Sequence, residues 1–314
     1  MSRDSIRIVE VGPRDGLQNE RTGVPLEVRI QFIRDLARAG LTEIELGSFV
    51  SPKAVPAMAD SEAVFTQTAD LTRVRRWGLV PNPRGQERAE RAGVDAYAFF
   101  TAASPDFLRE NLRTDLETQI TELREMVQSL RATRPEVPIA AYISTVVACP
   151  FRGAVAPGTV VALANRLHME VGIEELSLGD TIGVASPRDV DQLARAMADD
   201  YAGPLSQVRW HFHDTRGTAI ANVARVMEWG SFAGFDASAA GLGGCPFAPG
   251  ATGNLATEDL VYFLEREGVS TGVNLGWLAQ ASLPVLMALG RRPTAKAQVA
   301  ELAMRAGSGD TRKP

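Results

Sequence analysis

Cysteine is scarce in this chain, and the scarcity excludes one whole class of small secreted protein. Only two cysteines, Cys149 and Cys245, occur in 314 residues. They form no Cys-X-X-Cys pair, so the sequence predicts no disulfide framework. We therefore expect a protein of the reducing cytoplasm.

Long apolar runs and an excess of positive charge are also missing. No uninterrupted apolar stretch reaches about 18 residues, so we predict no transmembrane helix and no membrane partner. The first residues lack the apolar core of an export signal. A net charge of −5 gives no reason to expect a nucleic acid as a partner. The hydrophobic content of 45% and the charged content of 23% are typical of a globular protein with a sizeable core.

Short β-branched runs alternate with helical patterns along most of the chain. Eight strand-then-helix units in succession predict an α/β fold, a (β/α)8 TIM barrel of parallel strands, over residues 1–270. An open doubly wound sheet would require an early Gly-X-Gly-X-X-Gly turn, which the chain lacks. We predict strands over 6–11, 43–46, 74–80, 95–100, 139–147, 174–178, 208–212 and 235–239.

Helices are predicted between these strands and after the last one. Ser186 and Pro187 supply an N-cap and a first-turn proline for one of them. We expect residues 14–20 to form a polar loop, residues 271–306 to add one or two helices beside the barrel, and residues 307–314 to be a disordered tail. The helices are expected over 26–39, from about 53, and over 85–92, 115–131, 159–171, 187–199, 219–229 and 257–265.

Two of the three histidines stand one residue apart, at His211 and His213. In an extended strand, residues i and i+2 point to the same face, so both imidazoles aim at one place. This pattern suits two ligands of one divalent metal, although an isolated His-X-His pair is as often a pair of exposed strand-end histidines. An apolar run leads in and Asp-Thr-Arg-Gly follows, which places the pair at the carboxyl end of a strand.

Polar residues also follow or end other predicted strands. In a barrel these strand ends gather on one rim, where they supply carboxylate, imidazole and amide groups. Such a mixed set suits Mg²⁺, Mn²⁺, Co²⁺ or Zn²⁺, whereas each acid alone is more often a solvated loop residue or a helix cap. The candidates are Arg14, Asp15, Gln18, Glu45, Asp180, His211, His213, Cys245 and Asn254.

The segment 241–254 is rich in glycine and contains Cys245. Its glycines and prolines permit unusual backbone angles, as expected of a lid that folds over a ligand. A phosphate-binding loop is the competing interpretation, but the Gly-Lys-Ser/Thr end of a P-loop is absent. Cys245 is interpreted as a proton donor, a nucleophile or a small apolar filler.

Five blocks together resemble the hydroxymethylglutaryl-CoA lyases. They are residues 12–20 (Gly-Pro-Arg-Asp-Gly-Leu-Gln-Asn-Glu), 48–53 (Ser-Phe-Val-Ser-Pro-Lys), 177–183 (Ser-Leu-Gly-Asp-Thr-Ile-Gly), 211–215 (His-Phe-His-Asp-Thr) and 241–259. The resemblance implies a metal-dependent carbon–carbon lyase. Such an enzyme cleaves 3-hydroxy-3-methylglutaryl-CoA to acetoacetate and acetyl-CoA by a retro-Claisen reaction.

The resemblance also implies roles for the candidate residues. The metal ligands are Asp15, His211, His213 and Asn254, holding Mg²⁺ or Mn²⁺. Arg14 stabilises the charge of the enolate, Glu45 supports the metal site, and Cys245 protonates the product enolate. The base is left open among Asp180, Asp15 and a histidine of the metal site, His211 included. Arg14, Gln18 and Asp180 are the expected substrate contacts, the substrate is a small acyl-CoA, and the chain is expected to form a homodimer or higher homo-oligomer.

The chain departs from the family at the fourth and fifth strands. It has Ala140 where an arginine is usual, Arg152 where a glutamate is usual, and Ser104-Pro105-Asp106 where Ser-Glu is typical. We expect these positions to line the acyl pocket, which raises the hypothesis of a substrate with a C3 substituent larger than methyl. Arg152 is expected to replace a lost partner or to contact a CoA phosphate.

Two alternative hypotheses compete with that of a lyase. A Claisen-condensing acyltransferase of the isopropylmalate or homocitrate synthase type shares the Arg-Asp and His-X-His elements but does not need the cysteine loop. A barrel that serves only as a binding or scaffold protein would not need to keep every ligand candidate, so the presence of all of them argues against this alternative.

Overall fold

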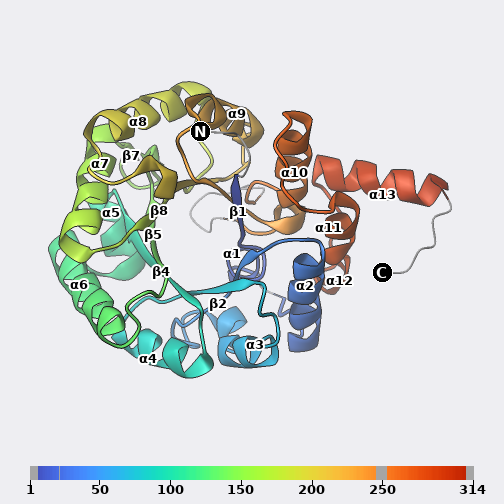
Figure 1. Ribbon diagram of the computed structural model, residues 1–314, viewed down its shortest axis with the longest axis horizontal. Helices are drawn as coiled ribbons and strands as arrows, with labels where there is room; N and C mark the ends of the chain where they lie inside the picture. Colours follow the sequence, from blue (N-terminus) through green and yellow to red (C-terminus); the bar gives the residue numbers. More distant parts are fainter. Residues whose placement is uncertain (1–5, 21, 245–252, 309–314) are drawn as a thin grey trace.

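Parallel strands close into a barrel in this computed structural model, which describes residues 6–20, 22–244 and 253–308. The order around the ring is β1-β10-β9-β8-β5-β4-β3-β2, and helices surround it as an outer layer (Figure 1). The predicted (β/α)8 fold is confirmed. The barrel strands are β1 (Arg7–Glu10), β2 (Glu43–Ser48), β3 (Arg75–Leu79), β4 (Ala96–Ala102), β5 (Ile139–Ser144), β8 (Glu175–Asp180), β9 (Val208–Phe212) and β10 (Gly234–Ala237).

Three of the outer helices begin at a side-chain N-cap. The side chain of Ser186 accepts a hydrogen bond from the backbone N–H of Asp189, whose carboxylate accepts one in return, so this helix has a capping box as well as its proline. Asp115 and Asn82 are simple N-caps of two other helices, where their side chains accept the backbone N–H groups of Thr118 and Gly85. The outer helices are α2 (Leu26–Arg38), α3 (Ser61–Gln67), α4 (Pro83–Ala92), α6 (Leu116–Thr133), α7 (Pro157–Arg166), α8 (Pro187–Asp200), α9 (Ala219–Trp229) and α10 (Thr257–Arg266).

Shorter elements lie in the connections. An antiparallel hairpin of β6 (Ala148–Cys149) and β7 (Gly153–Ala154) follows β5. The rest are α1 (Asp15–Gln18), α5 (Pro105–Phe107), the π-helical turns η2 (Leu108–Leu112) and η3 (Leu167–Val171), and the 3-10 turns η1 (Pro56–Met58), η4 (Leu205–Gln207) and η5 (Ala239–Gly241).

Four sequence-based expectations are corrected here. The polar loop at 14–20 contains the helical turn α1, because the N–H groups of Leu17 and Gln18 both reach the carbonyl of Arg14. No helix starts near residue 53: only the short turn η1, with proline at its start, precedes α3 at Ser61. The fifth strand ends at Ser144, because Thr145 adopts φ +60° and turns the chain away.

The fourth correction concerns the C-terminal helices, which number three within the described residues. They are α11 (Leu275–Ala281), α12 (Leu283–Ala288) and α13 (Lys296–Ser308). Proline near the start of α12 divides what reads as one helical stretch. These helices pack beside α2 and α10 on one side of the barrel (Figure 1). The expected tail begins inside α13, and its residues 309–314 lie outside the described part.

The barrel closes where β1 pairs with β10, and a glycine permits this seam. Gly234 is in register with Arg7 and has φ +154°. A Cβ at this position would lie 2.0 Å from the carbonyl oxygen of Arg7, so only glycine fits.

The main apolar core lies between the strands and the helices, whereas the barrel interior is partly charged. An apolar cluster in the interior has Val9, Trp77, Ala98 and Tyr142 among its members. Strands β2, β8, β9 and β10 supply charged side chains: Glu43, Glu45, Glu175, Arg209 and Asp236.

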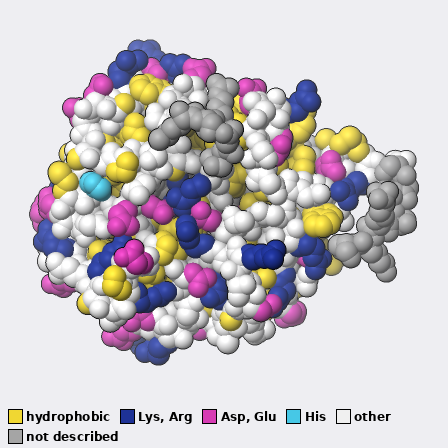
Figure 2. Space-filling model, viewed as in Figure 1, with side chains coloured by type: hydrophobic (Ala, Val, Ile, Leu, Met, Phe, Trp, Pro, Cys, Tyr) yellow, Lys and Arg dark blue, Asp and Glu magenta, His cyan; other side chains and the backbone are white. Residues whose placement is uncertain are grey.

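The surface carries charged side chains of both signs, as the nearly balanced numbers of basic and acidic residues indicate. On the face shown in Figure 2, Lys and Arg side chains lie interspersed with Asp and Glu side chains around the middle. Among the described residues, no helix is both long enough and apolar enough to cross a bilayer.

Candidate metal centre

Three ligand-type side chains meet at the carboxyl end of the barrel. Asp15 comes from α1 after the first strand, His211 from β9, and His213 from just beyond β9. Their ligand atoms all lie within 4.8 Å of one another. The structure thus brings together three residues that the His-X-His pattern and the strand-end rule singled out.

The two imidazoles are oriented by acceptors behind them. Nδ1 of His213 lies 3.0 Å from the carbonyl oxygen of Asp180, which leaves Nε2 for the cluster. Nδ1 of His211 lies 3.4 Å from Oδ2 of Asp236, and its Nε2 lies 3.9 Å from Oδ2 of Asp15. Burial, with His211 adding to it, lowers the pKa of His213 to about 4, so this imidazole is neutral and able to donate a lone pair.

Asn254 is held beside this cluster with one atom left over. It forms an isolated antiparallel bridge with His213, and its Nδ2 donates to Oδ2 of Asp15 (2.8 Å) and to the carbonyl of Leu242 (3.0 Å). Its Oδ1 is buried and has no hydrogen-bond partner. Gly253, with φ +114°, allows this approach, because a Cβ there would lie 2.0 Å from the carbonyl oxygen of Gly241.

These groups fit a divalent metal ion. The donors are two imidazole nitrogens, a carboxylate and an amide oxygen that is otherwise unsatisfied, a combination that suits a borderline or hard divalent cation. The pKa of Asp15 is lowered: burial would raise it, but Arg14 and the two histidines outweigh burial. The carboxylate is therefore ionised and able to bind a cation.

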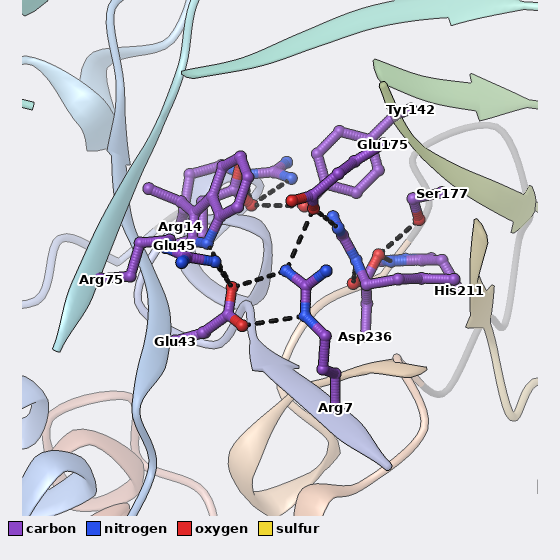
Figure 3. Close-up of polar contacts among 12 residues, drawn as sticks. Arg7, Arg14, Glu43, Glu45, Arg75, Tyr142, Glu175, Ser177, His211 and Asp236 are labelled. Atoms are coloured by element: carbon purple, nitrogen blue, oxygen red, sulfur yellow. Dashed lines mark hydrogen bonds and ion pairs between the residues drawn. The ribbon is translucent and has the colours of Figure 1, made fainter. Parts of the chain in front are cut away.

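Arg14 lies between two carboxylates and is almost fully buried. Its Nε and Nη2 lie 2.7 and 2.6 Å from Oε2 of Glu45, and its Nη1 lies 2.7 Å from Oδ1 of Asp15. Tyr142 stacks under the guanidinium at 5.4 Å and donates its hydroxyl to Glu45 at 3.2 Å (Figure 3). Burial would lower the pKa of Arg14, but Glu45 and Asp15 raise it above its ordinary value, so Arg14 stays cationic.

Glu45 does not end its strand, as the sequence suggested. It lies in the middle of β2, which continues to Ser48, and its side chain is completely buried. Burial raises the pKa of Glu45 despite the opposing effect of Arg14. Glu45 therefore anchors Arg14 from inside the barrel and is not a rim residue.

Gln18 and Asp180 each have a structural partner near the cluster. Nε2 of Gln18 donates to Oδ1 of Asp15 at 3.1 Å. The carboxylate of Asp180 accepts the backbone N–H groups of Val184 (3.0 Å) and Ala185 (2.9 Å). Burial raises the pKa of Asp180, and these two hydrogen bonds oppose the effect.

The predicted loop cysteine, Cys245, lies outside the described residues, but the root of its loop is described. Ala240 adopts φ +59°, and both carboxylate oxygens of Glu258 accept its backbone N–H. Glu10 accepts the N–H of Ala239 and the hydroxyl of Thr257. Burial raises the pKa of Glu258 to about 8 and that of Glu10 to about 7. Sequence reasoning missed both acids.

Sequence reasoning also missed Asp236 and Arg209, which lie behind His211. Both are buried charged residues inside otherwise apolar strands, and that contrast was the available signal. Burial would raise the pKa of Asp236, but Arg209 and His211 lower it, so Asp236 is an ionised carboxylate.

The departures on the fourth and fifth strands lie differently from what was expected. Ala140 is near the start of β5, fully buried inside the barrel and in register with Glu175, so it does not line a strand-end pocket. A guanidinium does reach this layer, because Arg209 lies 2.8 Å from Glu175. The guanidinium of Arg152 lies 2.7 Å from a carboxylate oxygen of Asp106.

A hollow lies at each end of the barrel in the part of the chain that the structure describes. One, of about 1000 Å³, adjoins the cluster through Asn254 and Gly243, and its lining includes Arg291, Arg292 and Lys296. The other, of about 630 Å³, lies at the opposite end, where residues such as Thr42 and Pro138 precede the strands. Only the first hollow adjoins the ligand cluster, so it is the candidate substrate cleft.

Comparison with known proteins gives consistent matches over nearly the whole chain. The HMGL-like family model matches residues 5–285. The hydroxymethylglutaryl-CoA lyase of Pseudomonas mevalonii is 44% identical over 94% of this chain and 96% of its own length. The 3-hydroxy-3-isohexenylglutaryl-CoA/hydroxymethylglutaryl-CoA lyase of Pseudomonas aeruginosa is 41% identical over 95% and 97%. The structure of an HMG-CoA lyase from Acinetobacter baumannii in complex with coenzyme A and 3-methylmalate superimposes with a TM-score of 0.87 at 34% identity, over 100% and 98% of the two chains.

Proposed function

The chain belongs to the HMGL-like family, and from this premise we propose that it is a carbon–carbon lyase that cleaves 3-hydroxy-3-methylglutaryl-CoA to acetoacetate and acetyl-CoA. The observation that carries the proposal is the meeting of Asp15, His211, His213 and Asn254 beside Arg14 at one end of the barrel. Relatives 41–44% identical over most of this chain bear the name hydroxymethylglutaryl-CoA lyase.

The reaction requires a base, a cation and a proton donor. The tertiary alcohol loses its proton to Asp180, Asp15 or a histidine of the cluster, the carbon–carbon bond breaks, and a thioester enolate forms. Arg14, fixed in place by Glu45, offsets the negative charge that develops on the thioester oxygen. Cys245 delivers a proton to the enolate carbon in this scheme, an assignment that rests on the family resemblance.

A divalent ion, Mg²⁺ or Mn²⁺, is proposed as the cofactor. Asp15, His211 and His213 would hold it together with Oδ1 of Asn254. When bound, such an ion supplies a Lewis acid that lowers the pKa of the substrate hydroxyl. The chain itself contributes the preformed set of neutral and anionic donors and keeps each of them oriented by a hydrogen bond or a close charge contact.

The cleft beside Asn254 is proposed to receive the CoA moiety. Arg291, Arg292 and Lys296 line it together with Asn19 and Gly243. Cationic side chains of this kind pair with phosphate groups, while the acyl end reaches the cluster. Arg291 is held in place by a two-pronged ion pair with Glu20 at 2.7 and 2.9 Å.

A second candidate substrate carries a C3 substituent larger than methyl. It is favoured by the Pseudomonas aeruginosa relative, whose name includes a 3-isohexenyl substrate. The position of Ala140 does not contribute to this case, because it lies away from the cleft.

One assay tests the proposal and separates the two substrates. Acetyl-CoA release is followed with 3-hydroxy-3-methylglutaryl-CoA and with analogues that carry longer C3 substituents. We expect the methyl compound to have the higher kcat/KM. The ratio should correspond to a difference in activation free energy of more than about 1–3 kcal/mol, the range expected per methylene in an apolar pocket. A preference for the longer analogue selects the second candidate, and no cleavage of either compound overturns the lyase proposal.

We propose further that the chain works as a homodimer or higher homo-oligomer. Trp277, Met287 and Met304 expose large apolar side chains on the C-terminal helices, as is common where chains associate. Sedimentation velocity measures the oligomeric state directly, and a monomer at assay concentration contradicts this proposal.

The scarcity of cysteine supports a reducing compartment such as the cytoplasm.

A further inference from the structure

A buried arginine lies directly behind the histidine of the candidate metal centre. Arg209 stands two residues before His211 on β9 and is only 1% exposed. Its Nε donates to Oδ1 of Asp236 at 2.8 Å, and the side chain of Asp236 is completely buried. Arg209 therefore provides the positive charge that this carboxylate needs inside the barrel.

Asp236 connects this arginine to His211. It is in register with His211 on the neighbouring strand, and its second oxygen, Oδ2, lies 3.4 Å from Nδ1 of His211. The same oxygen accepts the hydroxyl of Ser177, and Figure 3 shows Asp236 and Ser177 beside the imidazole. At 3.4 Å the approach of Asp236 to Nδ1 is a close charge contact and not a hydrogen bond. A carboxylate beside Nδ1 favours the proton on that nitrogen, which leaves the lone pair of Nε2 directed toward Asp15 and His213.

Arg209 is held at both ends, so it can keep Asp236 in one place. Its Nη1 donates to Oε2 of Glu175 at 2.8 Å, and its guanidinium stacks on the ring of Trp77 at 5.5 Å. Glu175 is held in turn by Arg7 at 3.0 Å (Figure 3). The result is an ordered row of alternating charges that leads from the amino end of the barrel to the ligand cluster.

Arg209 contacts neither the ligand atoms nor the substrate cleft. It is absent from the lining of the cleft beside Asn254, and its hydrogen bonds go to Asp236 and Glu175. The direct contact route from Arg209 to His211 therefore passes through Asp236. If the cation is removed, a buried carboxylate is left unpaired and must turn away or change its hydrogen bonding, which frees the imidazole to rotate.

We propose that Arg209 is a positioning residue of this centre: through Asp236 it fixes the imidazole of His211 with Nε2 directed at Asp15 and His213. This inference rests on the proposed function only in taking the cluster as a divalent-metal site. It assigns Arg209 a task in organising the site that is separate from its contribution to the barrel core.

The test is Mn²⁺ binding by the metal-free full chain. It is measured by isothermal titration calorimetry and by the electron paramagnetic resonance spectrum of free Mn²⁺. Arg209→Met keeps the length of the side chain and removes the charge. We expect it to weaken Mn²⁺ affinity by about 10–100-fold, the usual loss when the partner that orients a ligand is removed. Asp236→Asn should give a loss of similar size, and the double variant should lose no more than either single variant, because both act through one contact.

Arg76→Met is the matched control. Arg76 is also a buried barrel arginine paired with an aspartate, Asp95, but this pair has no link to the cluster. Equal losses in Arg76→Met and Arg209→Met would overturn the proposal, as would wild-type affinity in a folded Arg209→Met. If Arg209→Met does not fold, Arg209→Lys replaces it: its ammonium donates from one point and cannot reproduce the separate Nε and Nη1 contacts to Asp236 and Glu175, so wild-type affinity in that variant counts against the proposal. Wild-type protein that binds no Mn²⁺ refutes the metal site itself and is thereby distinguished from a failure of Arg209 alone.

Discussion

Arg152 and Asp106 form an ion pair between the loops that follow the fifth and fourth barrel strands, with Nε of Arg152 2.7 Å from a carboxylate oxygen. Both residues stand at positions where the chain departs from the family pattern. The side chain of Arg152 is 60% exposed and that of Asp106 is 21% exposed. Asp106 lies in α5 and also pairs with Arg109, so two cations share this acid.

Arg152→Ala is expected to change kcat/KM for 3-hydroxy-3-methylglutaryl-CoA by less than about 3-fold, and the free energy of unfolding by less than about 1 kcal/mol, because exposed ion pairs contribute little. Asp106→Ala should behave alike. Steady-state kinetics and urea unfolding measure both quantities. A loss of catalysis greater than tenfold in Arg152→Ala alone, with Asp106→Ala normal, would place Arg152 on the substrate.

Removal of the metal is expected to abolish cleavage, and Mg²⁺ or Mn²⁺ should restore it. His211→Ala should lower Mn²⁺ affinity by more than tenfold, because it removes one of the nitrogen donors. His168→Ala is the control, since this third histidine lies in the turn η3 and contacts Ile173 and Tyr201. Full activity in exhaustively chelated protein contradicts the assignment.

Arg14→Gln is expected to lower kcat by about 10²–10³-fold with little change in KM, because it removes a cation that acts on charge formed in the transition state. It also leaves the buried Glu45 without its partner, which costs about 3–5 kcal/mol of stability. The double variant Arg14→Gln/Glu45→Gln should recover stability but not activity. Unfolding curves and kinetics on the three proteins separate the two effects, and a normal kcat in either variant refutes the catalytic role.

Glu258 is expected to make stability depend on pH. Its pKa in the folded chain is raised by burial from 4.5 to about 8, so the folded state keeps a proton that the unfolded state releases. The stabilisation is complete below about pH 4.5 and is lost as pH rises through about 8. The free energy of unfolding of the wild-type protein should therefore fall by roughly 2–4 kcal/mol between pH 5 and 8. Glu258→Gln should not show this fall.

Urea unfolding at pH 5, 6.5 and 8 measures this dependence. Glu27→Gln, an exposed acid on α2, is the control and should follow the wild-type curve. Parallel curves for Glu258→Gln and wild-type protein would show that Glu258 titrates in the folded chain as it does in the unfolded one.

The fold class and most of the candidate ligands follow from local patterns in the sequence. Apolar runs separated by capped helical patterns are local signals, and parallel strands separated by helices have few ways to pack. The spacing of His211 and His213 is likewise local, because a strand places alternate residues on one face. Asp15 could be placed beside them because all barrel strands end on one rim.

The groups that stand behind those candidate ligands depend instead on tertiary contacts. Glu45, Asp236 and Arg209 come from three different strands, and their contacts depend on register and on the stagger of the closed barrel, which no local pattern encodes. The same holds for Ala140, where counting along the fifth strand suggested a pocket residue and the register placed it deep inside beside Glu175. Long-range pairing, such as that of Asp106 with Arg152 or of Asn254 with His213, is set by where loops meet after the barrel has closed.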